Sequence, residues 1–289
     1  MIGRGMIEGD GMSGGASSPP WGAYAPSLSA RAIIALARHT PLGRGAGRRR
    51  LAEALARLHP GPVDSWLWNT KVRLHPARNV SERKALLRPD RMDPEEYELV
   101  RRYMSRPAAV FVDVGANAGL YSLYSALHAG AAGRILAIEP NAPLLDRLRF
   151  NLARAHDAKL IDESVVVEME TVAVGEADEE ALLSIGDSDG GSTLLDGTGT
   201  PVKVRRLDVL LDEHGIEAPT VMKIDVEGYE DHVLPPYLLA VPRARWPKAV
   251  ILEHAHAHRW AVDCVAMCKE CGYRAAVITG NNTVLILET

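Results

Sequence analysis

Residues 108–119 read AAVFVDVGANAG, and this stretch decides the fold. Its first half is an unbroken apolar run of the length of a strand. Its glycines allow a sharp turn before GLYSLYSALHAG at 119–130, which has the pattern of a helix. A buried strand that leads through a glycine turn into a helix is typical of a β-α-β unit. The segment therefore predicts an α/β domain.

Strands and helices continue to alternate to the end of the chain. Further strand-like runs are RILAIEP at 134–140, SVVVEMETVAVG at 164–175, TVMKIDVEG at 220–228 and KAVILEHA at 248–255. Strands separated by helices indicate right-handed crossovers and a mostly parallel sheet. The Gly/Ser/Asp-rich residues 184–201 predict a loop. The last two strands, within RAAVITGNNTVLILET at 274–289, are joined by a short turn and predict an antiparallel hairpin at the C-terminal edge.

The residues before this domain divide into two parts. Residues 1–30 contain MSGGASSPPWG and show little periodicity, which predicts a flexible tail. Residues 31–106 hold two short helix patterns, a strand or hairpin pattern and a further helix with Asp93 as its N-cap. They predict a helical and hairpin extension that caps the site or mediates oligomer formation. Residues 107–289 are the expected ligand-binding domain.

Bulk composition excludes several classes of protein. Of 289 residues, 47% are hydrophobic and 24% are charged, which is ordinary for a globular protein, and no apolar run has the length of a membrane helix. Three cysteines do not make a disulfide framework, so we expect a cytoplasmic protein. Residues 1–106 carry 18 Lys/Arg and 10 Asp/Glu, whereas the remainder has a net charge of −12, which argues against a nucleic-acid partner.

The loop after the first strand has the features of a ligand site, because open α/β sheets bind ligands at the carboxyl ends of their strands. The spacing is not that of a dinucleotide site, since Asn117 stands where a second glycine is needed. Asp113 is also poorly placed for a pyrophosphate at the start of the next helix. We expect Asp113 to face an ammonium group while the amides of the loop bind a carboxylate.

An acid follows the second strand as well. Glu139 lies 20 residues beyond Gly119, and a carboxylate in this position can accept both hydroxyls of a ribose. An amino-acid end, a ribose and, by extension, an adenine describe S-adenosylmethionine. A purely structural role for the two acids is the alternative.

These motifs resemble the FkbM family of S-adenosylmethionine-dependent methyltransferases. In the family's order, and over about residues 70–289, the chain contains FVDVGANAGLYSL, AIEPNAPLLDRLRFNLA, AVG, GGSTL, VRRLDVLL, KIDVEGYEDHVL and VILEH. The resemblance implies a class I methyltransferase fold, which is Rossmann-like, and methylation of a hydroxyl on a sugar or polyketide-type metabolite. The predicted cofactor-binding residues are Asp113, Gly115, Ala116, Asn117, Gly119, Glu139, Pro140, Ala173 and Asp225.

The charged end of TVMKIDVEG predicts the floor of an active site rather than a solvated strand exit. Lys223, Asp225 and Glu227 alternate, so in an extended strand all three point to one face. Methyl transfer to an alcohol needs the acceptor oxygen aligned and its proton accepted. We expect Asp225 to orient the acceptor or take its proton, with support from Glu227. Lys223 would either lower the pKa of the hydroxyl or neutralise Asp225.

The next strand ends in Glu253, followed by alternating histidines. Glu253 is expected to face Asp225 across neighbouring strand ends. By analogy with other hydroxyl methyltransferases, these two carboxylates are candidate ligands of a divalent metal such as Mg²⁺. His254, His256 and His258 would share one strand face, where a zinc site is the alternative. His254 is the second candidate for the general base.

The sequence thus favours an S-adenosylmethionine-dependent O-methyltransferase that acts on a small-molecule hydroxyl acceptor, either alone or as a homo-oligomer. Two other functions stay open: an NAD-dependent oxidoreductase or epimerase, against which Asn117 speaks, and a non-catalytic S-adenosylmethionine-binding protein. Cys264, Cys268 and Cys271 have the spacing of radical S-adenosylmethionine enzymes. Their helical periodicity predicts buried side chains instead.

Overall fold

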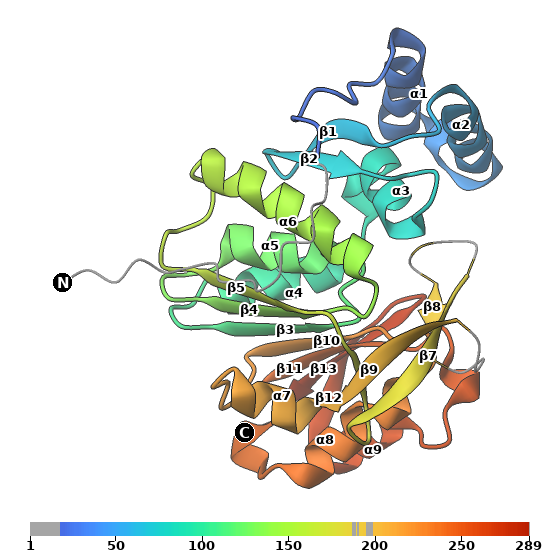
Figure 1. The fold of residues 1–289 in the computed structure, drawn as a ribbon. Helices are drawn as coiled ribbons and strands as arrows, with labels where there is room; N and C mark the ends of the chain where they lie inside the picture. Colours follow the sequence, from blue (N-terminus) through green and yellow to red (C-terminus); the bar gives the residue numbers. More distant parts are fainter. Residues whose placement is uncertain (1–17, 187–188, 190, 195–198, 289) are drawn as a thin grey trace.

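The structure is a computed structural model that describes residues 18–186, 189, 191–194 and 199–288. Its centre is a seven-stranded sheet with the strand order β12-β13-β11-β10-β3-β4-β5 (Figure 1). These strands are β3 (Val110–Val114), β4 (Arg134–Ile138), β5 (Val166–Glu170), β10 (Val221–Ile224), β11 (Ala249–Glu253), β12 (Tyr273–Ile278) and β13 (Asn282–Leu287). The order confirms the predicted α/β fold of the class I methyltransferases, with its mostly parallel sheet.

The direction of strand addition reverses at the middle of the sheet. From β3 the chain adds β4 and β5 on one side, and it then returns to add β10 and β11 on the other, all in parallel. The predicted C-terminal hairpin is present, and its second strand, β13, is inserted antiparallel between β11 and β12. The switch point between β3 and β10 is where an open α/β sheet leaves room for ligands.

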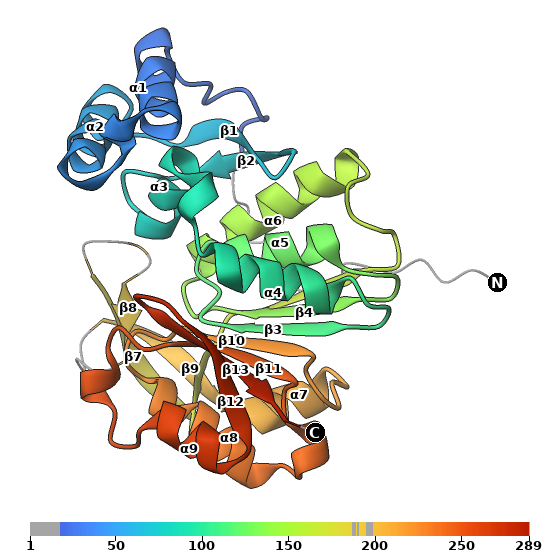
Figure 2. The same cartoon turned by 180° about the vertical axis from the view of Figure 1, so that it is seen from behind.

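Helices cover both faces of the central sheet. Figures 1 and 2 show α4 (Pro94–Met104), α5 (Leu120–His128) and α6 (Ala142–Asp157) on one face. The opposite face carries α7 (Leu207–Glu213), α8 (Leu234–Ala240) and α9 (Cys264–Glu270). Successive side chains of β3 alternate between the two layers: Phe111 is buried in the cluster of the first face and Val112 in that of the second. Burial on both sides explains why strands such as β3 and β11 are mostly apolar.

The predicted third strand, 164–175, is in fact two strands in different sheets. After β5 the chain leaves the central sheet, and β6 (Ala173–Gly175) pairs with β9 (Thr200–Arg206). A small sheet in the order β6-β9-β7-β8 follows; β8 (Ser192–Thr193) and the last two residues of β7 (Glu179–Ile185) lie in the region predicted as a loop. Valines occur on both sides of the crossing between sheets, so the residue types do not reveal it. Residues 187–188, 190 and 195–198 of the predicted loop lie outside the described residues.

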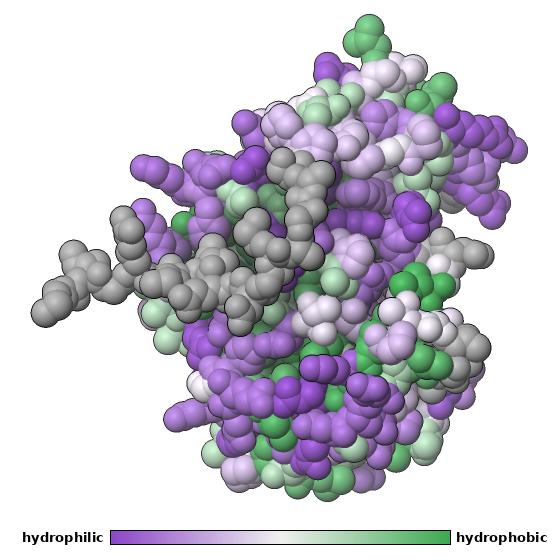
Figure 3. All heavy atoms as spheres, in the orientation of Figure 1, coloured by the Kyte–Doolittle hydropathy of each residue, from purple (hydrophilic) through white to green (hydrophobic). Residues whose placement is uncertain are grey.

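Two helices and a hairpin precede the central domain. They are α1 (Leu28–His39), α2 (Gly45–Leu58), β1 (Val63–Leu67) and β2 (Thr70–Leu74), followed by α3 (Val80–Leu87). Short 3₁₀ turns lie at Pro41–Gly43, Pro89–Arg91 and Arg243–Arg245. The surface over α2 is strongly hydrophilic (Figure 3). Among the described residues, no helix combines the length and the apolar character needed to cross a membrane.

A buried arginine fastens the start of the described chain to the hairpin. Arg73 donates to Asp64 Oδ1 at 2.8 Å and to the carbonyl oxygens of Pro19 and Pro20. The amide of Asn151 on α6 accepts the backbone N–H of Arg73 at 2.7 Å, so the hairpin is also held against the central domain. Residues 1–17 of the predicted flexible tail lie outside the described residues.

Candidate active site

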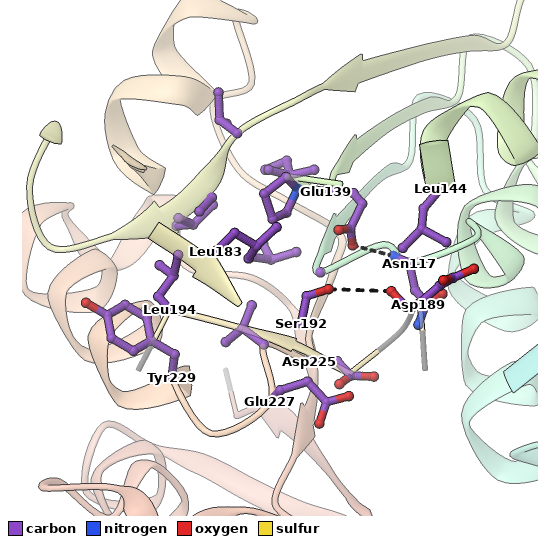
Figure 4. Close-up of a pocket in the computed structure, with 18 residues that line it drawn as sticks. Asn117, Glu139, Leu144, Leu183, Asp189, Ser192, Leu194, Asp225, Glu227 and Tyr229 are labelled. Carbon is purple, nitrogen blue, oxygen red and sulfur yellow. Dashed lines mark hydrogen bonds between the residues drawn. The ribbon is translucent and has the colours of Figure 1, made fainter. Parts of the chain in front are cut away.

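Two cavities meet at the carboxyl ends of β3 and β10. The first, about 610 Å³ with the space open to solvent included, lies between the central sheet and the small sheet (Figure 4). The second, about 1240 Å³ on the same basis, lies between the central sheet and the residues that precede it. Asn117, Asp225 and Glu227 line both cavities. A ligand in one cavity therefore approaches a ligand in the other at these three side chains.

The glycine loop after β3 touches the end of β10. Gly115 has a φ of +75°, and a Cβ on it would lie 1.9 Å from the carbonyl oxygen of Asp225. Gly119 begins α5 with a φ of +71°, and its Cβ would meet the side chain of Leu148 at 2.6 Å. Both positions need glycine for conformation and for space. Gly115 thus brings the loop directly against the turn that carries Asp225, and Gly119 brings it against Leu148 of α6.

Glu139 holds the same loop from the other side. Its Oε2 accepts the N–H of Asn117 at 2.8 Å (Figure 4), and its Oε1 accepts the N–H of Asn141 at 3.0 Å. Burial raises the pKa of Glu139 to about 7, although these two N–H groups oppose the shift. Each carboxylate oxygen has a second lone pair that can accept a ligand hydroxyl.

The remaining walls of the first cavity are mostly apolar. They include Ile138, Pro140, Val172, Ala173, Val174, Leu183 and Leu194. Such walls suit a flat apolar ring beside the polar end formed by the glycine loop. Of the residues predicted to bind a cofactor, Gly115, Asn117, Glu139, Pro140, Ala173 and Asp225 line this cavity, and Ala116 lines the second.

Asp113 lies behind the cavities instead of in their walls. It is fully buried, its Oδ2 accepts the hydroxyl of Ser122 at 2.6 Å, and its Oδ1 is 4.0 Å from Lys223 Nζ. Burial raises the pKa of Asp113, and the charge of Lys223 opposes that shift. The structure therefore gives no support to a direct contact between Asp113 and a ligand ammonium, because Asp113 lines neither cavity and its carboxylate lies beside Ser122 and Lys223.

Lys223 connects the buried Asp113 to the cavity-lining Asp225. Its Nζ donates to Asp225 Oδ2 at 2.9 Å and lies 5.1 Å from the centre of the Tyr121 ring. Burial alone would lower the pKa of Lys223, but the carboxylates of Asp225 and Asp113 outweigh it and raise that pKa. The lysine is therefore charged, and it fixes the orientation of the Asp225 carboxylate.

Glu227 reaches both cavities from a turn and not from an extended strand. β10 ends at Ile224, and Glu227 has a φ of +56°. The turn is held by Glu230, whose Oε1 accepts the N–H groups of Val226 and Gly228 at 2.9 and 3.2 Å. The predicted alternation along a strand is therefore wrong beyond Ile224, although Asp225 and Glu227 still face the same space.

We expect Glu230→Ala to lower the free energy of unfolding by about 3 kcal/mol, because three N–H donors lose a buried acceptor. The third donor is Trp260 Nε1, at 2.7 Å from Glu230 Oε2. Glu230→Gln keeps one acceptor oxygen and is the matched control, with a smaller expected loss of about 1 kcal/mol. Urea unfolding of both variants measures the difference, and equal losses would show that the hydrogen bonds do not hold the turn.

The three histidines do not share a strand face. β11 ends at Glu253, and a 3₁₀ turn, Ala257–Arg259, follows. His254 Nδ1 lies 2.9 Å from Thr283 Oγ1, and His254 lines neither cavity, so its role as a second general base loses its geometric basis. His256 lines the second cavity instead, with Nε2 at 3.2 Å from Glu227 Oε2. The alternation fails because the chain leaves the sheet directly after Glu253.

A metal site has little support in this geometry. In the part of the chain that the structure describes, no group of three or more His, Cys, Asp or Glu residues is placed to hold a metal ion. The Oδ2 of Asp225, one of the two predicted ligands, is paired with Lys223. Cys264 and Cys268 are buried in α9, as their periodicity predicts.

Several residues of the second cavity could not be identified from the sequence. Lys84 reaches this cavity from α3, and Asn79 reaches it from the position just before α3. Asn281 and Asn282 reach it from the C-terminal hairpin. Asp93 also lines it; its carboxylate pairs with Lys84 and accepts the hydroxyl of Tyr121, and it makes no capping hydrogen bond to α4. Only the folded chain brings these polar residues together, and no local motif marks them.

Glu253, the last residue of β11, lines the second cavity together with Asp225. Burial raises its pKa to about 8, and the charges of Asp225, Glu230 and Glu227 add to the shift. An acid with a raised pKa keeps its proton in the folded protein and loses it in the unfolded chain. The folded state therefore loses stability as the pH rises from about 4.5 to about 8.

We expect Glu253→Gln to remove this loss. The gain in stability of the variant over the wild type should be larger at pH 8 than at pH 5 by about 2 kcal/mol. Urea unfolding at both pH values measures it, and Glu163→Gln, at an exposed acid, is the control. A pH-independent difference would mean that Glu253 titrates near its ordinary pKa.

Comparison with known proteins agrees with this geometry. The model of the methyltransferase FkbM domain matches residues 113–275, which is more than half of the chain. The AMB antimetabolite synthetase AmbE of Pseudomonas aeruginosa is 35% identical over 161 residues, 44% of this chain; the chain spans only 8% of the length of that relative.

Solved structures with similar folds are also methyltransferases. The apo structure of CalS11, a TDP-rhamnose 3′-O-methyltransferase of calicheamicin biosynthesis, has a TM-score of 0.44 and 13% identity, over 90% of this chain and 94% of that one. A methyltransferase from Geobacter sulfurreducens has a TM-score of 0.41 and 15% identity, over 72% and 87%. On the match of the domain model, the chain belongs to the FkbM methyltransferase domain family.

Proposed function

We propose that the protein is an S-adenosylmethionine-dependent O-methyltransferase that acts on a hydroxyl of a small metabolite of the sugar or polyketide type. The observation that carries the proposal is the meeting of two cavities at Asn117, Asp225 and Glu227. A methyl donor in one and an acceptor in the other would have their reacting groups at this junction. Membership of a methyltransferase family supplies the reaction class.

The first cavity has the chemistry that S-adenosylmethionine requires. The amides of the glycine loop around Gly115 and Asn117 would bind its carboxylate, and Glu139 would accept its ribose hydroxyls. The apolar wall at Pro140 and Ala173 would cover the adenine. When bound, the cofactor supplies an electrophilic methyl group on a positively charged sulfur.

Asp225 is the carboxylate placed for proton transfer. A hydroxyl that becomes an ether loses its proton, and a positioned carboxylate accelerates such steps. Lys223 holds Asp225 through Oδ2, which leaves Oδ1 for the acceptor hydroxyl. Asp113 is a positioning residue that acts through Lys223, and Glu227 and Glu253, whose pKa values are raised, are further polar groups around the acceptor. His256, which contacts Glu227, replaces His254 as the second candidate for the general base.

Calorimetric titration tests the proposal directly. We expect S-adenosylmethionine and S-adenosylhomocysteine to bind with micromolar dissociation constants and NAD to give no signal, because the loop lacks the dinucleotide glycine spacing. Binding of NAD alone would overturn the proposal in favour of a dehydrogenase or epimerase. Binding of the sulfur ligands without turnover of any hydroxyl acceptor would favour a non-catalytic binding protein. Repeating the titration and the assay with a chelator tests whether Mg²⁺ takes part.

We further propose that the N-terminal extension caps the acceptor cavity, because Asn79, Lys84 and Asp93 lie in its wall. Lys84→Met removes a charge there while keeping much of the side-chain length. We expect it to raise the KM of the acceptor several-fold and to leave the affinity for S-adenosylhomocysteine unchanged. Steady-state kinetics and calorimetry separate the two effects, and an unchanged KM would contradict a capping role for this residue.

A further inference from the structure

One carboxylate oxygen in the second cavity has no partner. Glu253 is only 7% exposed, and its Oε2 makes no hydrogen bond in the structure. Glu253 lines the second cavity and not the first. A buried polar atom without a partner, on a residue that lines a cavity, calls for an explanation, and a ligand group in that cavity supplies one.

The second cavity also holds more acids than bases. Its lining includes Asp93, Asp225, Glu227 and Glu253, against the two cations Lys84 and Lys223. Each lysine is already paired, Lys84 with Asp93 and Lys223 with Asp225. Among the described residues, Glu253 forms no ion pair with a lysine, arginine or histidine, and Glu227 is paired with His256 alone.

We propose that the acceptor carries a cationic amino group that binds to Glu253 and Glu227, in addition to the hydroxyl that is methylated. The substrate class is thus a hydroxylated amine, such as an amino sugar, an amino alcohol or a hydroxylated amino acid. This inference rests on the proposed function, since it identifies the second cavity as the acceptor site. An ammonium group donates hydrogen bonds to both carboxylates and balances their charge.

The surrounding charges agree with this assignment. Burial raises the pKa of Glu227 to about 7, and the carboxylates of Asp225 and Glu230 add to the shift. The pKa of Glu253 is raised further, to about 8. Burial, with the repulsion of neighbouring carboxylates added to it, thus favours the protonated form of both groups, and a bound cation offsets both effects.

Two other occupants fit the observations less well. The positive sulfur of the cofactor would lie in the first cavity, which Glu253 does not line. A metal ion needs several ligands, and the described residues bring no three His, Cys, Asp or Glu side chains together for one. An ammonium group needs only two hydrogen-bond acceptors and a hydroxylated body that fits the polar walls.

The test compares two probes that differ in one group, 2-amino-1,3-propanediol and glycerol. Binding to the protein saturated with S-adenosylhomocysteine is measured by calorimetry at constant ionic strength, for the wild type, Glu253→Gln and the control Glu163→Gln. We expect the amine to bind at least about tenfold more tightly than glycerol to the wild type and the control. Glu253→Gln should lose most of this preference.

Equal binding of the two probes to the wild type, up to tens of millimolar, would overturn the inference. So would a preference for the amine that survives in Glu253→Gln, or binding of Mg²⁺ that depends on Glu253 without any preference for the amine. These outcomes are separate from failure of the proposed function. That failure would appear as no binding of S-adenosylhomocysteine itself. Methylation of neutral alcohols alone would overturn only the inference that the acceptor carries an amino group.

Discussion

Asp225→Asn is expected to lower kcat for methyl transfer by about 10²–10⁴-fold, the usual contribution of a general base. Asp225 lines both cavities and is held by Lys223 Nζ at 2.9 Å. An asparagine keeps the size of the side chain and loses the ability to accept a proton. Because the glycine loop and Glu139 are untouched, the affinity for S-adenosylhomocysteine should stay within about threefold. Calorimetry and a methyl-transfer assay on the same samples measure the two quantities.

The control for this variant is Asp146→Asn. Asp146 is an exposed acid on α6 whose ion pair with Arg149 lies on the surface, so its loss should change little. If Asp225→Asn keeps more than a tenth of the wild-type kcat, the base is another residue, and Glu253 and His256 become the next candidates. Circular dichroism and urea unfolding would show whether a larger loss reflects misfolding, since Lys223 would keep only Asp113 as a charged partner.

Gly115→Ala is expected to lower the free energy of unfolding by about 3–5 kcal/mol, with loss of cofactor binding. Two penalties combine at this position. A φ of +75° costs a side chain about 1–2 kcal/mol. The new Cβ would also lie 1.9 Å from the carbonyl oxygen of Asp225 and 2.8 Å from its carbonyl carbon. Because backbone cannot move aside as a flexible side chain can, the loop and the turn must separate.

Gly215→Ala measures the cost of a side chain at a positive φ without a steric clash. Gly215 has a φ of +60°, and nothing lies within 4 Å of its added Cβ. We expect this variant to lose only about 1–2 kcal/mol and to bind S-adenosylhomocysteine normally. Urea unfolding of both variants gives the difference between them. Equal losses would mean that the loop and the turn of Asp225 can move apart freely, against the close contact in the structure.

Much of the fold follows from the sequence because buried parallel strands have a strong signature. AAVFVDVG, RILAIEP and TVMKI are mostly apolar, and each is followed or preceded by a helix pattern of the right length. The short turn at Asn281 fixes the C-terminal hairpin. The sequence could not show that the chain changes sheets between β5 and β6, since valines typical of strands occur on both sides of the crossing.

The site was predictable where a residue's position follows from strand ends alone. Gly115, Glu139 and Asp225 come directly after strands of the central sheet, Glu253 is the last residue of one, and all four line a cavity. The direction of a side chain was harder to predict. Asp113 also lies on a central strand, but its carboxylate is turned into the interior toward Lys223.

Residues that depend on a change of backbone direction were placed wrongly. The histidines after β11 alternate in sequence, yet the chain bends into a 3₁₀ turn after Glu253, so only His256 faces the second cavity. Alternation predicts a shared face only while the chain remains extended. The wall formed by Asn79 and Lys84 depends on tertiary packing between segments far apart in the chain, for which a single sequence holds no local signal.

The division of the walls between segments of the chain has an evolutionary consequence. Residues 79–97 and 253–282 contribute to the second cavity and are absent from the first, which is built from residues 114–144 and 172–229. Mutation or recombination in the outer segments can therefore change the choice of acceptor without altering recognition of the methyl donor. Asn117, Asp225 and Glu227 belong to both cavities, and change at these positions affects both ligands. Diversification of substrate should thus concentrate in the outer segments, while these three junction positions change slowly.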